Sequence, residues 1–310
     1  MHQLTVRVPA STSNLGPGFD CLGVALRIYN DVTVTRAAHS QPPSMAGEAA
    51  DLFFARTGRL PFSFSLSVRG AVPRARGLGG SVTVRLGVLC ALNALTGNRL
   101  DRLSIFELCS QLEGHPDNAA PAVFGGFTVV QGQTVQRFDV SKRLSFILLV
   151  PNFEVRTARA RKILPSRILR AAAVENCASA CAITAAFASG NYLNLRGVFR
   201  DRLHQPYREK LIPFLPGVIA AAEKAGALGA FLSGSGSTIA AVALHSSKKV
   251  AAAMARAASD AGRTIITHAD NGGARILPIC NSDIRSRACE ELRCPRLAPP
   301  QLTWAAGLKD

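Results

Sequence analysis

The sequence predicts an α+β protein with two mixed domains, and three observations lead to this class. Segments near the N-terminus alternate hydrophobic and polar residues, as half-buried strands do. Helix-like segments with a repeat near 3.6 residues follow a glycine-rich loop. A second set of strand-like and helix-like segments follows Pro151. With 310 residues and 48% hydrophobic content, the chain is long enough for two domains or for one large one.

The first domain is expected over residues 1–150. A stretch rich in serine, proline, alanine and glycine at 37–47 is expected to be a loop. Asp101 and Ser104 are the two candidate caps for the helix that follows them. Strands are expected at residues 5–8, 24–35, 62–69, 122–130 and 144–150, and helices at 48–57, 81–95 and 103–113.

The second domain is expected over residues 151–280. Helices are expected at 168–189, 192–199, 218–225 and 250–261, and strands at 230–233, 239–243 and 275–277. Residues 281–310 lose this periodicity and carry three prolines between Pro295 and Pro300. We expect this tail to be poorly ordered or to form an appended helix, without chemistry of its own.

The sequence favours a cytoplasmic protein without a membrane partner. Its first eight residues alternate like a strand, which is unlike a secretory signal. No uninterrupted apolar run approaches the length of about 18 residues that spans a bilayer. The eight cysteines are scattered without paired Cys-x-x-Cys motifs, which favours buried free thiols over a zinc site or disulfides.

The chain is strongly basic, with 36 lysines and arginines against 20 acidic residues and a formal charge of +16. Such a charge attracts anions, including ATP and nucleic acid. The densest basic stretches, 156–162 and 196–208, lack the interleaved aromatic residues of a base-stacking surface. We therefore expect no specific nucleic-acid partner, and the charge fits either a solvated surface or attraction of an anionic substrate.

Residues 72–81 read Val-Pro-Arg-Ala-Arg-Gly-Leu-Gly-Gly-Ser and lead directly into an apolar helical pattern. Glycines and a serine at the head of a helix can expose several backbone N–H groups to a phosphate. The spacing matches neither Gly-x-x-x-x-Gly-Lys-Ser/Thr nor Gly-x-Gly-x-x-Gly. By itself the loop fits a phosphate cradle and a plain strand-to-helix turn equally well.

Four segments place polar groups between apolar elements, which suggests a shared cleft. They are residues 9–20, 77–81, 113–118 and 232–238. In this order and spacing they resemble the small-molecule kinases of the GHMP family, over about residues 3–279. Residues 10–23, 113–126 and 201–208 resemble, within that family, the branch that phosphorylates L-homoserine.

The resemblance implies a two-domain GHMP kinase fold. Its N-terminal domain is related to ribosomal protein S5 domain 2, its C-terminal domain is ferredoxin-like, and ATP binds between them. The family also implies Mg²⁺ as a cofactor, a homodimer and a role in threonine biosynthesis. Two alternatives stay open, namely a GHMP kinase for another small alcohol and a catalytically silent binding protein of the same fold.

The resemblance assigns nucleotide and metal residues. It implies that Ser81 and Glu107 bind Mg²⁺. Glu107 lies eleven residues before Asn118, which matches the family's metal-binding acid. From spacing alone, Ser81 also fits a helix N-cap and Glu107 an exposed helix acid. The residues implied for nucleotide binding are Arg76, Gly77, Leu78, Gly79, Gly80, Ser81, Ser233 and Gly234.

The resemblance also assigns the acceptor pocket. It implies that Asp20 binds the ammonium of L-homoserine and that Arg161 and Arg208 bind its carboxylate. Asn14 and Asn118 are implied as catalytic residues that bind the remaining polar atoms.

His115 is the further substrate-binding candidate, and by itself it also fits a turn residue. No general base is assigned. The sequence departs from the family pattern where Gly80 replaces a serine, Val82-Thr83-Val84 replaces small residues and Ser237 replaces a proline.

Overall fold

The computed structural model describes residues 2–37, 40 and 42–278, whose named strands form two antiparallel sheets. The first sheet has the order β10-β1-β2-β4-β5, with β3 also paired to β2, and the second has the order β7-β8-β6-β9. The first sheet comprises β1 (Gln3–Asn14), β2 (Gly18–Arg36), β3 (Phe64–Gly70), β4 (Phe127–Gln131), β5 (Thr134–Phe138) and β10 (Arg275–Ile276). The second comprises β6 (Ser145–Pro151), β7 (Gly229–Leu232), β8 (Ile239–Ala243) and β9 (Gly262–His268).

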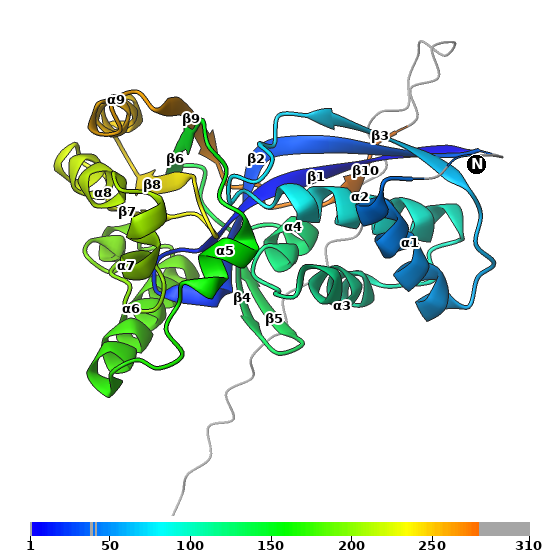
Figure 1. Ribbon diagram of the computed structural model, residues 1–310, viewed down its shortest axis with the longest axis horizontal. Coiled ribbons are helices and arrows are strands. Elements are labelled where there is room, and N and C mark those ends of the chain that lie inside the picture. Colours follow the sequence, from blue (N-terminus) through cyan, green and yellow to red (C-terminus); the bar gives the residue numbers. More distant parts are fainter. Residues whose placement is uncertain (1, 38–39, 41, 279–310) are drawn as a thin grey trace, which may run out of the picture. The chain divides into compact units, whose positions relative to one another are not determined.

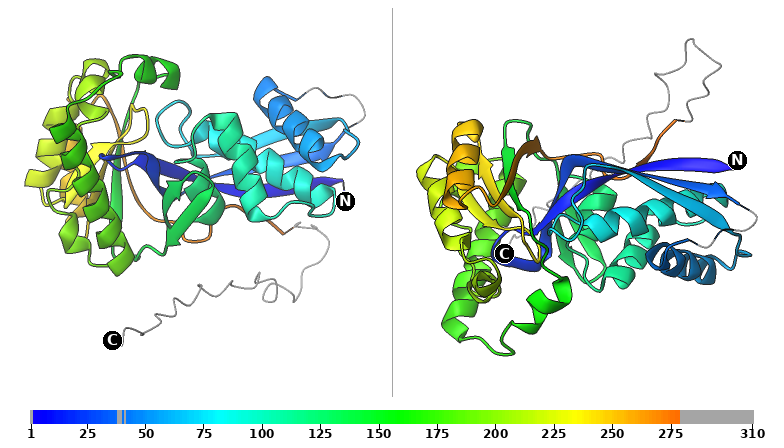
Figure 2. Two further views of the ribbon diagram at one scale, coloured as in Figure 1. Left: turned by 90° about the horizontal axis from the view of Figure 1, so that it is seen from below. Right: turned by 45° about the horizontal axis from the view of Figure 1, so that its top comes forward.

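The helices of the first half lie along one side of β1 and β2, as Figure 1 and the two views in Figure 2 show. They are α1 (Ser44–Thr57), α2 (Gly80–Leu95), α3 (Arg102–Glu113) and α4 (Ala119–Phe124). The later helical segments are α5 (Thr157–Lys162), α6 (Arg170–Ser189), η1 (Tyr192–Leu195), α7 (Gln205–Arg208), η2 (Glu209–Leu211), α8 (Leu215–Lys224) and α9 (Ser247–Ala257). Of these, α8 and α9 pack beside the strands of the second sheet.

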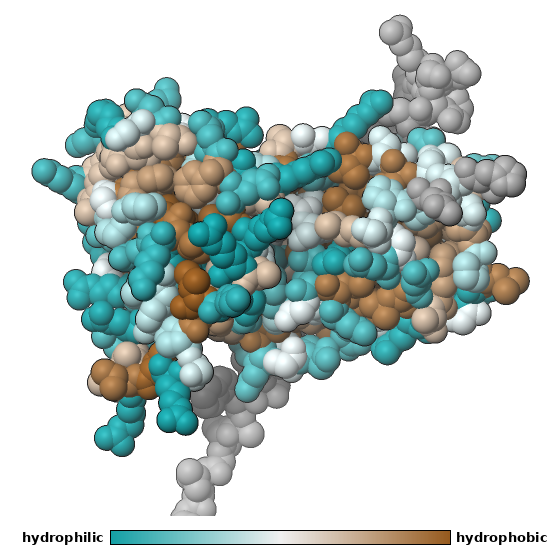
Figure 3. Space-filling model, viewed as in Figure 1, coloured by the Kyte–Doolittle hydropathy of each residue, from teal (hydrophilic) through white to brown (hydrophobic). Residues whose placement is uncertain are grey.

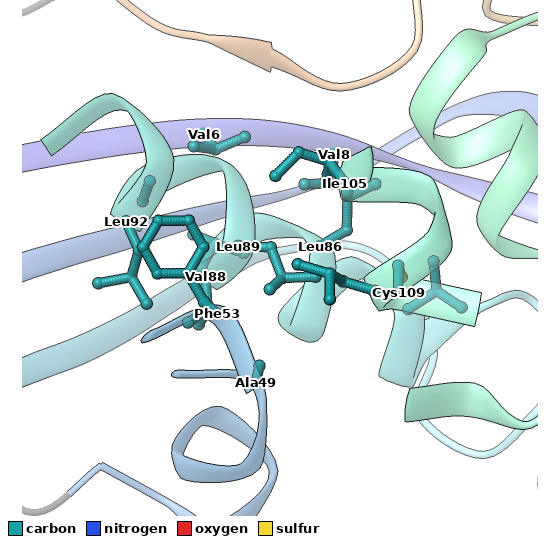
Figure 4. Packing of buried hydrophobic residues seen from close by; sticks show 14 of the residues in the cluster. Val6, Val8, Ala49, Phe53, Leu86, Val88, Leu89, Leu92, Ile105 and Cys109 are labelled. Carbon is teal, nitrogen blue, oxygen red and sulfur yellow. The ribbon is translucent and has the colours of Figure 1, made fainter. Parts of the chain in front are cut away.

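The first hydrophobic core lies between the first sheet and helices α1, α2 and α3 (Figure 4). Val6 and Val8 point from β1 toward Leu86 and Leu89 of α2, and all four side chains are completely buried. A fully buried leucine of this kind contributes about 1.5–3 kcal/mol through removal of its surface from water. Because α2 carries the glycine loop at its N-terminus, this core fixes the position of that loop.

A second hydrophobic cluster joins the two sheets. Phe127 of β4 stacks on Phe187 of α6 with ring centroids 4.3 Å apart, and Phe199 stacks on Phe231 of β7 at 5.2 Å. The residues up to Pro278 accordingly form one compact unit. The expected boundary at residue 150 falls within β6, and the division into 1–150 and 151–280 stays a prediction.

One expected strand is partly wrong. Residues 119–124, which include the start of the strand expected at 122–130, form α4, and the strand begins only at Phe127. Gly125 and Gly126, with φ of +74° and +71°, separate the two elements. A short apolar run has no periodicity that distinguishes a helix from a buried strand.

Other elements also differ from the expectation. The segments β5, β9 and α5 were not expected, and within 192–199 only Tyr192–Leu195 is helical. The expected tail at 281–310 lies outside the described residues.

Hydrophilic and hydrophobic residues are interspersed on the face drawn in Figure 3. By length and composition alone α6 could cross a bilayer, which is weak support for a membrane role.

Candidate active site

Residues 76–81 form a glycine-rich turn that leads into α2. Gly77 and Gly79 have φ of +71° and +67°, a conformation that glycine adopts without steric cost. A Cβ at Gly77 would lie 2.1 Å from the Ser233 carbonyl oxygen, and one at Gly79 would lie 2.4 Å from Ser11 Oγ. Glycine is therefore required for the loop to approach both neighbouring segments. Among the described residues no side chain caps α2, so its N-terminal N–H groups and dipole favour an anion there.

The glycine loop is hydrogen-bonded to two segments that are distant in sequence. The Ser11 N–H of β1 donates to the Leu78 carbonyl at 3.2 Å. Ser233 Oγ donates to the Gly77 carbonyl at 2.6 Å and also lies 2.8 Å from Thr12 Oγ1. Three of the four segments singled out in the sequence thus meet at this loop.

Asn118 brings the fourth segment to the same place. Its Nδ2 donates to Ser13 Oγ, and its Oδ1 accepts a hydrogen bond from Ser11 Oγ, both at 2.9 Å. Asn118 is buried, with 7% of its surface exposed. Both ends of its amide therefore hold residues 113–118 against β1.

Asn14 has a similar bridging position at the end of β1, where it has a φ of +69°. Its Oδ1 accepts from the Asp20 N–H at 3.0 Å, and its Nδ2 donates to the Gly234 carbonyl at 3.1 Å. The side chain connects the turn between β1 and β2 to the loop after β7. Asn14 and Asn118 lie in the site, and each holds two segments together.

Asp20 and Arg161 form a two-pronged ion pair. Arg161 Nη1 donates to Asp20 Oδ2 at 2.9 Å, and Nη2 donates to Oδ1 at 2.6 Å. About a third of each side chain is exposed, 37% for Arg161 and 34% for Asp20. The guanidinium groups of Arg161 and Arg208 each lie 5.4 Å from the centre of the Phe19 ring. The acid and the two arginines expected for the acceptor are therefore together, with Asp20 and Arg161 bonded to each other.

Arg208 is buried and held by groups from several segments. Its Nη1 donates to the Gly234 carbonyl at 2.9 Å and to His204 Nδ1 at 3.2 Å, and its Nε donates to the Ala160 carbonyl at 3.2 Å. His204 Nε2 lies 2.8 Å from the Gly16 carbonyl, which can only accept. This arrangement requires a neutral His204 with its proton on Nε2.

Burial lowers the pKa of both side chains in that contact. It lowers the pKa of His204 to about 4. Burial, together with the charge of Arg161, lowers the pKa of Arg208 to about 10, so the guanidinium still carries its charge at pH 7.

His115 pairs with Asp117, whose Oδ1 lies 2.8 Å from His115 Nδ1. Burial lowers the pKa of His115, but the hydrogen bond to Asp117 and its charge outweigh burial, so the pKa lies above the ordinary value. Asp117 also lies 3.4 Å from Asn118 Nδ2. The pair places an imidazole with a raised pKa beside the buried Asn118.

Ser81 contacts an acid other than the expected one. Its Oγ donates to Glu113 Oε2 at 2.7 Å. Glu107 instead lies 3.3 Å from Arg56 of α1. Six residues, which is between one and two helical turns, separate Glu107 from Glu113 along α3, and the structure brings only Glu113 to Ser81.

Arg76 is held by the segment that follows β6. Its Nε donates to the Pro151 carbonyl at 3.0 Å and its Nη2 to the Asn152 carbonyl at 3.2 Å, and Nη1 lies 3.1 Å from Glu154. Arg76 therefore connects the glycine loop to the end of the second sheet.

Sequence reasoning gave no role to two residues that the structure places in the site. Glu113 is the first residue of the Glu-Gly-His-Pro-Asp-Asn segment, and its place in that motif could have identified it as a site residue. Arg85 lies one helical turn after Ser81 and donates to Glu113 Oε1 at 2.8 Å. No spacing rule distinguished Arg85 from the many other arginines.

Two family models match this chain. The model described as "GHMP kinases N terminal domain" matches residues 44–126, and the one described as "GHMP kinases C terminal" matches residues 182–263.

Curated relatives cover nearly the whole chain. A homoserine kinase of Caldicellulosiruptor bescii is 36% identical, covering 91% of this chain and 99% of the relative. A homoserine kinase of Microchaete diplosiphon is 37% identical, covering 89% and 98%. The crystal structure of a homoserine kinase from Cytophaga hutchinsonii has a TM-score of 0.82 over 89% of this chain and 98% of that one, and its 24% identity supports the fold alone.

Proposed function

The chain belongs to the GHMP kinase family, and we propose that it is an ATP-dependent kinase that transfers the γ-phosphoryl group to the hydroxyl of L-homoserine. One observation carries the proposal: hydrogen bonds join four segments into one site. These are the glycine loop before α2, the end of β1 with the turn that follows it, residues 113–118 and the loop after β7. The product, O-phospho-L-homoserine, serves threonine biosynthesis.

The glycine loop would hold the phosphates of ATP. Gly77 and Gly79 bring the backbone close, and the uncapped N-terminus of α2 attracts the negative charge. Ser233 and Gly234 border the loop from the second sheet. The backbone at Gly80 is compatible with the serine that the family has there, since a Cβ would lie 3.2 Å from the Pro73 carbonyl oxygen and crowd it only mildly. Gly80 therefore leaves the loop in a conformation that suits this role.

The residues that would hold Mg²⁺ are Ser81 and Glu113, in place of the pair Ser81 and Glu107. A hydroxyl and a carboxylate are the hard oxygen donors that magnesium prefers, and phosphate and water complete its shell. When bound, the ion neutralises charge that develops on the phosphates during transfer. Among the described residues, no three His, Cys, Asp or Glu side chains gather into a metal site of their own.

The acceptor pocket would be built from six residues, namely Asn14, Asp20, His115, Asn118, Arg161 and Arg208. L-Homoserine carries an ammonium and a carboxylate, which match an acid and an arginine respectively. Since Asp20 and Arg161 are paired, binding would exchange this pair for two new ones, with the ammonium on Asp20 and the carboxylate on Arg161. Positioning and electrostatic stabilisation would then carry the transfer, and no protein base is assigned.

We further propose a cytoplasmic homodimer without a specific nucleic-acid or membrane partner. Use of ATP as the donor supports the cytoplasmic location. The basic charge fits attraction of ATP as an anionic substrate.

The proposal is tested with a panel of small alcohols, each incubated with the purified protein, ATP and Mg²⁺, followed by mass identification of products. We expect phosphorylation of L-homoserine at a kcat/KM at least tenfold above any other alcohol. Preference for an alcohol without a carboxylate would contradict the acceptor assignment. ATP bound without any phosphorylated product would instead support a silent binding protein.

A further inference from the structure

The buried carboxylate of Glu113 is fully engaged before any ligand arrives. Its Oε2 accepts from Ser81 Oγ at 2.7 Å, and its Oε1 accepts from Arg85 Nη1 at 2.8 Å. Only 6% of the Glu113 side chain is exposed, compared with 16% of the Arg85 side chain. A buried carboxylate in this position requires a counter-charge, and Arg85 provides it.

Arg85 of α2 is itself held by two other helices, α1 and α3. Its Nη1 also donates to the Leu112 carbonyl near the end of α3 at 2.7 Å, and its Nη2 donates to Glu48 of α1 at 3.0 Å. The Nε is buried and has no hydrogen-bond partner within the described part of the chain. These contacts hold the guanidinium charge one helical turn from Ser81.

This arrangement disfavours the binding of a divalent cation in the absence of nucleotide. A metal ion at Ser81 and Glu113 would share one buried carboxylate with a guanidinium, close to the positive N-terminal end of α2. Among the described residues, the protein ligands there are one carboxylate and one hydroxyl, so most of the six oxygens around the ion must come from phosphate and water. The negative charge of a bound triphosphate would change this balance.

We infer that Arg85 is a positioning residue that acts through Glu113 and makes metal binding conditional on the nucleotide. It keeps Glu113 neutralised and oriented toward Ser81, so a divalent cation enters only together with the phosphates. The inference rests on the proposed function, since it takes the glycine loop as the phosphate site.

Binding of Mn²⁺, followed by electron paramagnetic resonance without turnover, tests this role. Wild-type protein is expected to bind free Mn²⁺ at least tenfold more weakly than in the presence of a non-hydrolysable ATP analogue. The variant R85M is expected to bind free Mn²⁺ at least tenfold more tightly than wild type. The variant R85K retains the charge and should resemble wild type, while E113Q added to R85M should abolish the gain.

Several results would overturn the inference. The first is that wild type binds free Mn²⁺ as tightly as it does with the analogue, and that E113Q abolishes this binding. Another is R85M that folds, by circular dichroism, and binds free Mn²⁺ no better than wild type. If R85M does not fold, R85Q, which also removes the charge, takes its place in the same titration. Because these titrations need no phosphoryl transfer, a protein that fails to phosphorylate homoserine contradicts the proposed function without affecting this test.

Discussion

The pairing of Asp20 with Arg161 is the single-residue feature with the clearest consequence for specificity. An alcohol that carries only one charge would open the pair and leave one partner without a counter-charge. A zwitterion satisfies both partners. The pocket should therefore favour an α-amino acid over alcohols of similar size.

The substitution D20N tests this specificity. We expect it to lower kcat/KM for L-homoserine by about tenfold to a hundredfold, the range for loss of one charged hydrogen bond. Activity toward 4-hydroxybutyrate, which lacks the ammonium, should change less than threefold. Steady-state kinetics with both acceptors measure the difference, and an equal loss on both would contradict the assignment of Asp20 to the ammonium.

The two acids of α3, Glu107 and Glu113, provide a test variant and a matched control for the metal site. Because Glu113 contacts Ser81 and Glu107 contacts Arg56, E113Q should raise the Mg²⁺ concentration for half-maximal rate at least tenfold. The variant E107Q should stay within about twofold, since it loses only a partly exposed ion pair. Rates measured across a Mg²⁺ series compare them. A larger effect of E107Q would support Glu107, the acid that the family resemblance implies, as the metal ligand.

Among the elements, the glycine loop determines how closely α2 approaches the second sheet. The variant G77A would place a Cβ 2.1 Å from a backbone carbonyl at a φ of +71°. We expect at least a hundredfold weaker ATP binding by isothermal titration. Gly58 provides the control, because it has a φ of +63° with nothing within 4 Å of a Cβ. G58A should cost about 1 kcal/mol of stability and leave ATP affinity unchanged. Equal effects of the two variants would show that clash at Gly77 is unimportant.

His204 connects the turn between β1 and β2 with α7, and its protonation should break that connection. The pKa of His204 falls from 6.5 in the unfolded chain to about 4 in the folded protein, so the unfolded state binds the proton more tightly. The stabilisation is complete above about pH 6.5 and is lost as the pH falls toward 4, by up to about 3 kcal/mol.

Urea unfolding of wild type and H204Q between pH 7 and pH 4 measures this loss. The variant has no titratable group at residue 204, so its stability should fall less steeply with decreasing pH. Parallel curves for the two proteins would exclude His204 as the source of the acid sensitivity.

For the molecule as a whole, the sequence predicted the α+β class and the two-domain kinase fold. It also predicted that four polar segments come together, as their hydrogen bonds show. Local patterns were sufficient for long helices such as α2 and α6. They were insufficient for residues 119–124, where a short apolar run fits a helix and a strand equally, and for β9, whose pairing with β6 is a tertiary contact.

The acids of the site show the same limit. The family resemblance selected Glu107, but the direction in which α3 presents each carboxylate depends on how α3 packs against α2. The contacts of Arg85 with α1 and α3 are likewise invisible in a linear pattern. Which polar groups would meet the ligands is therefore decided by packing between elements.

The most direct test of the account is a crystal structure of the protein with a non-hydrolysable ATP analogue, Mg²⁺ and L-homoserine. The account predicts the terminal phosphate against residues 77–81, the metal on Ser81 and Glu113, and the homoserine ammonium on Asp20, with its hydroxyl facing the terminal phosphorus. A nucleotide bound away from the glycine loop, or homoserine bound away from Asp20 and Arg161, would contradict it.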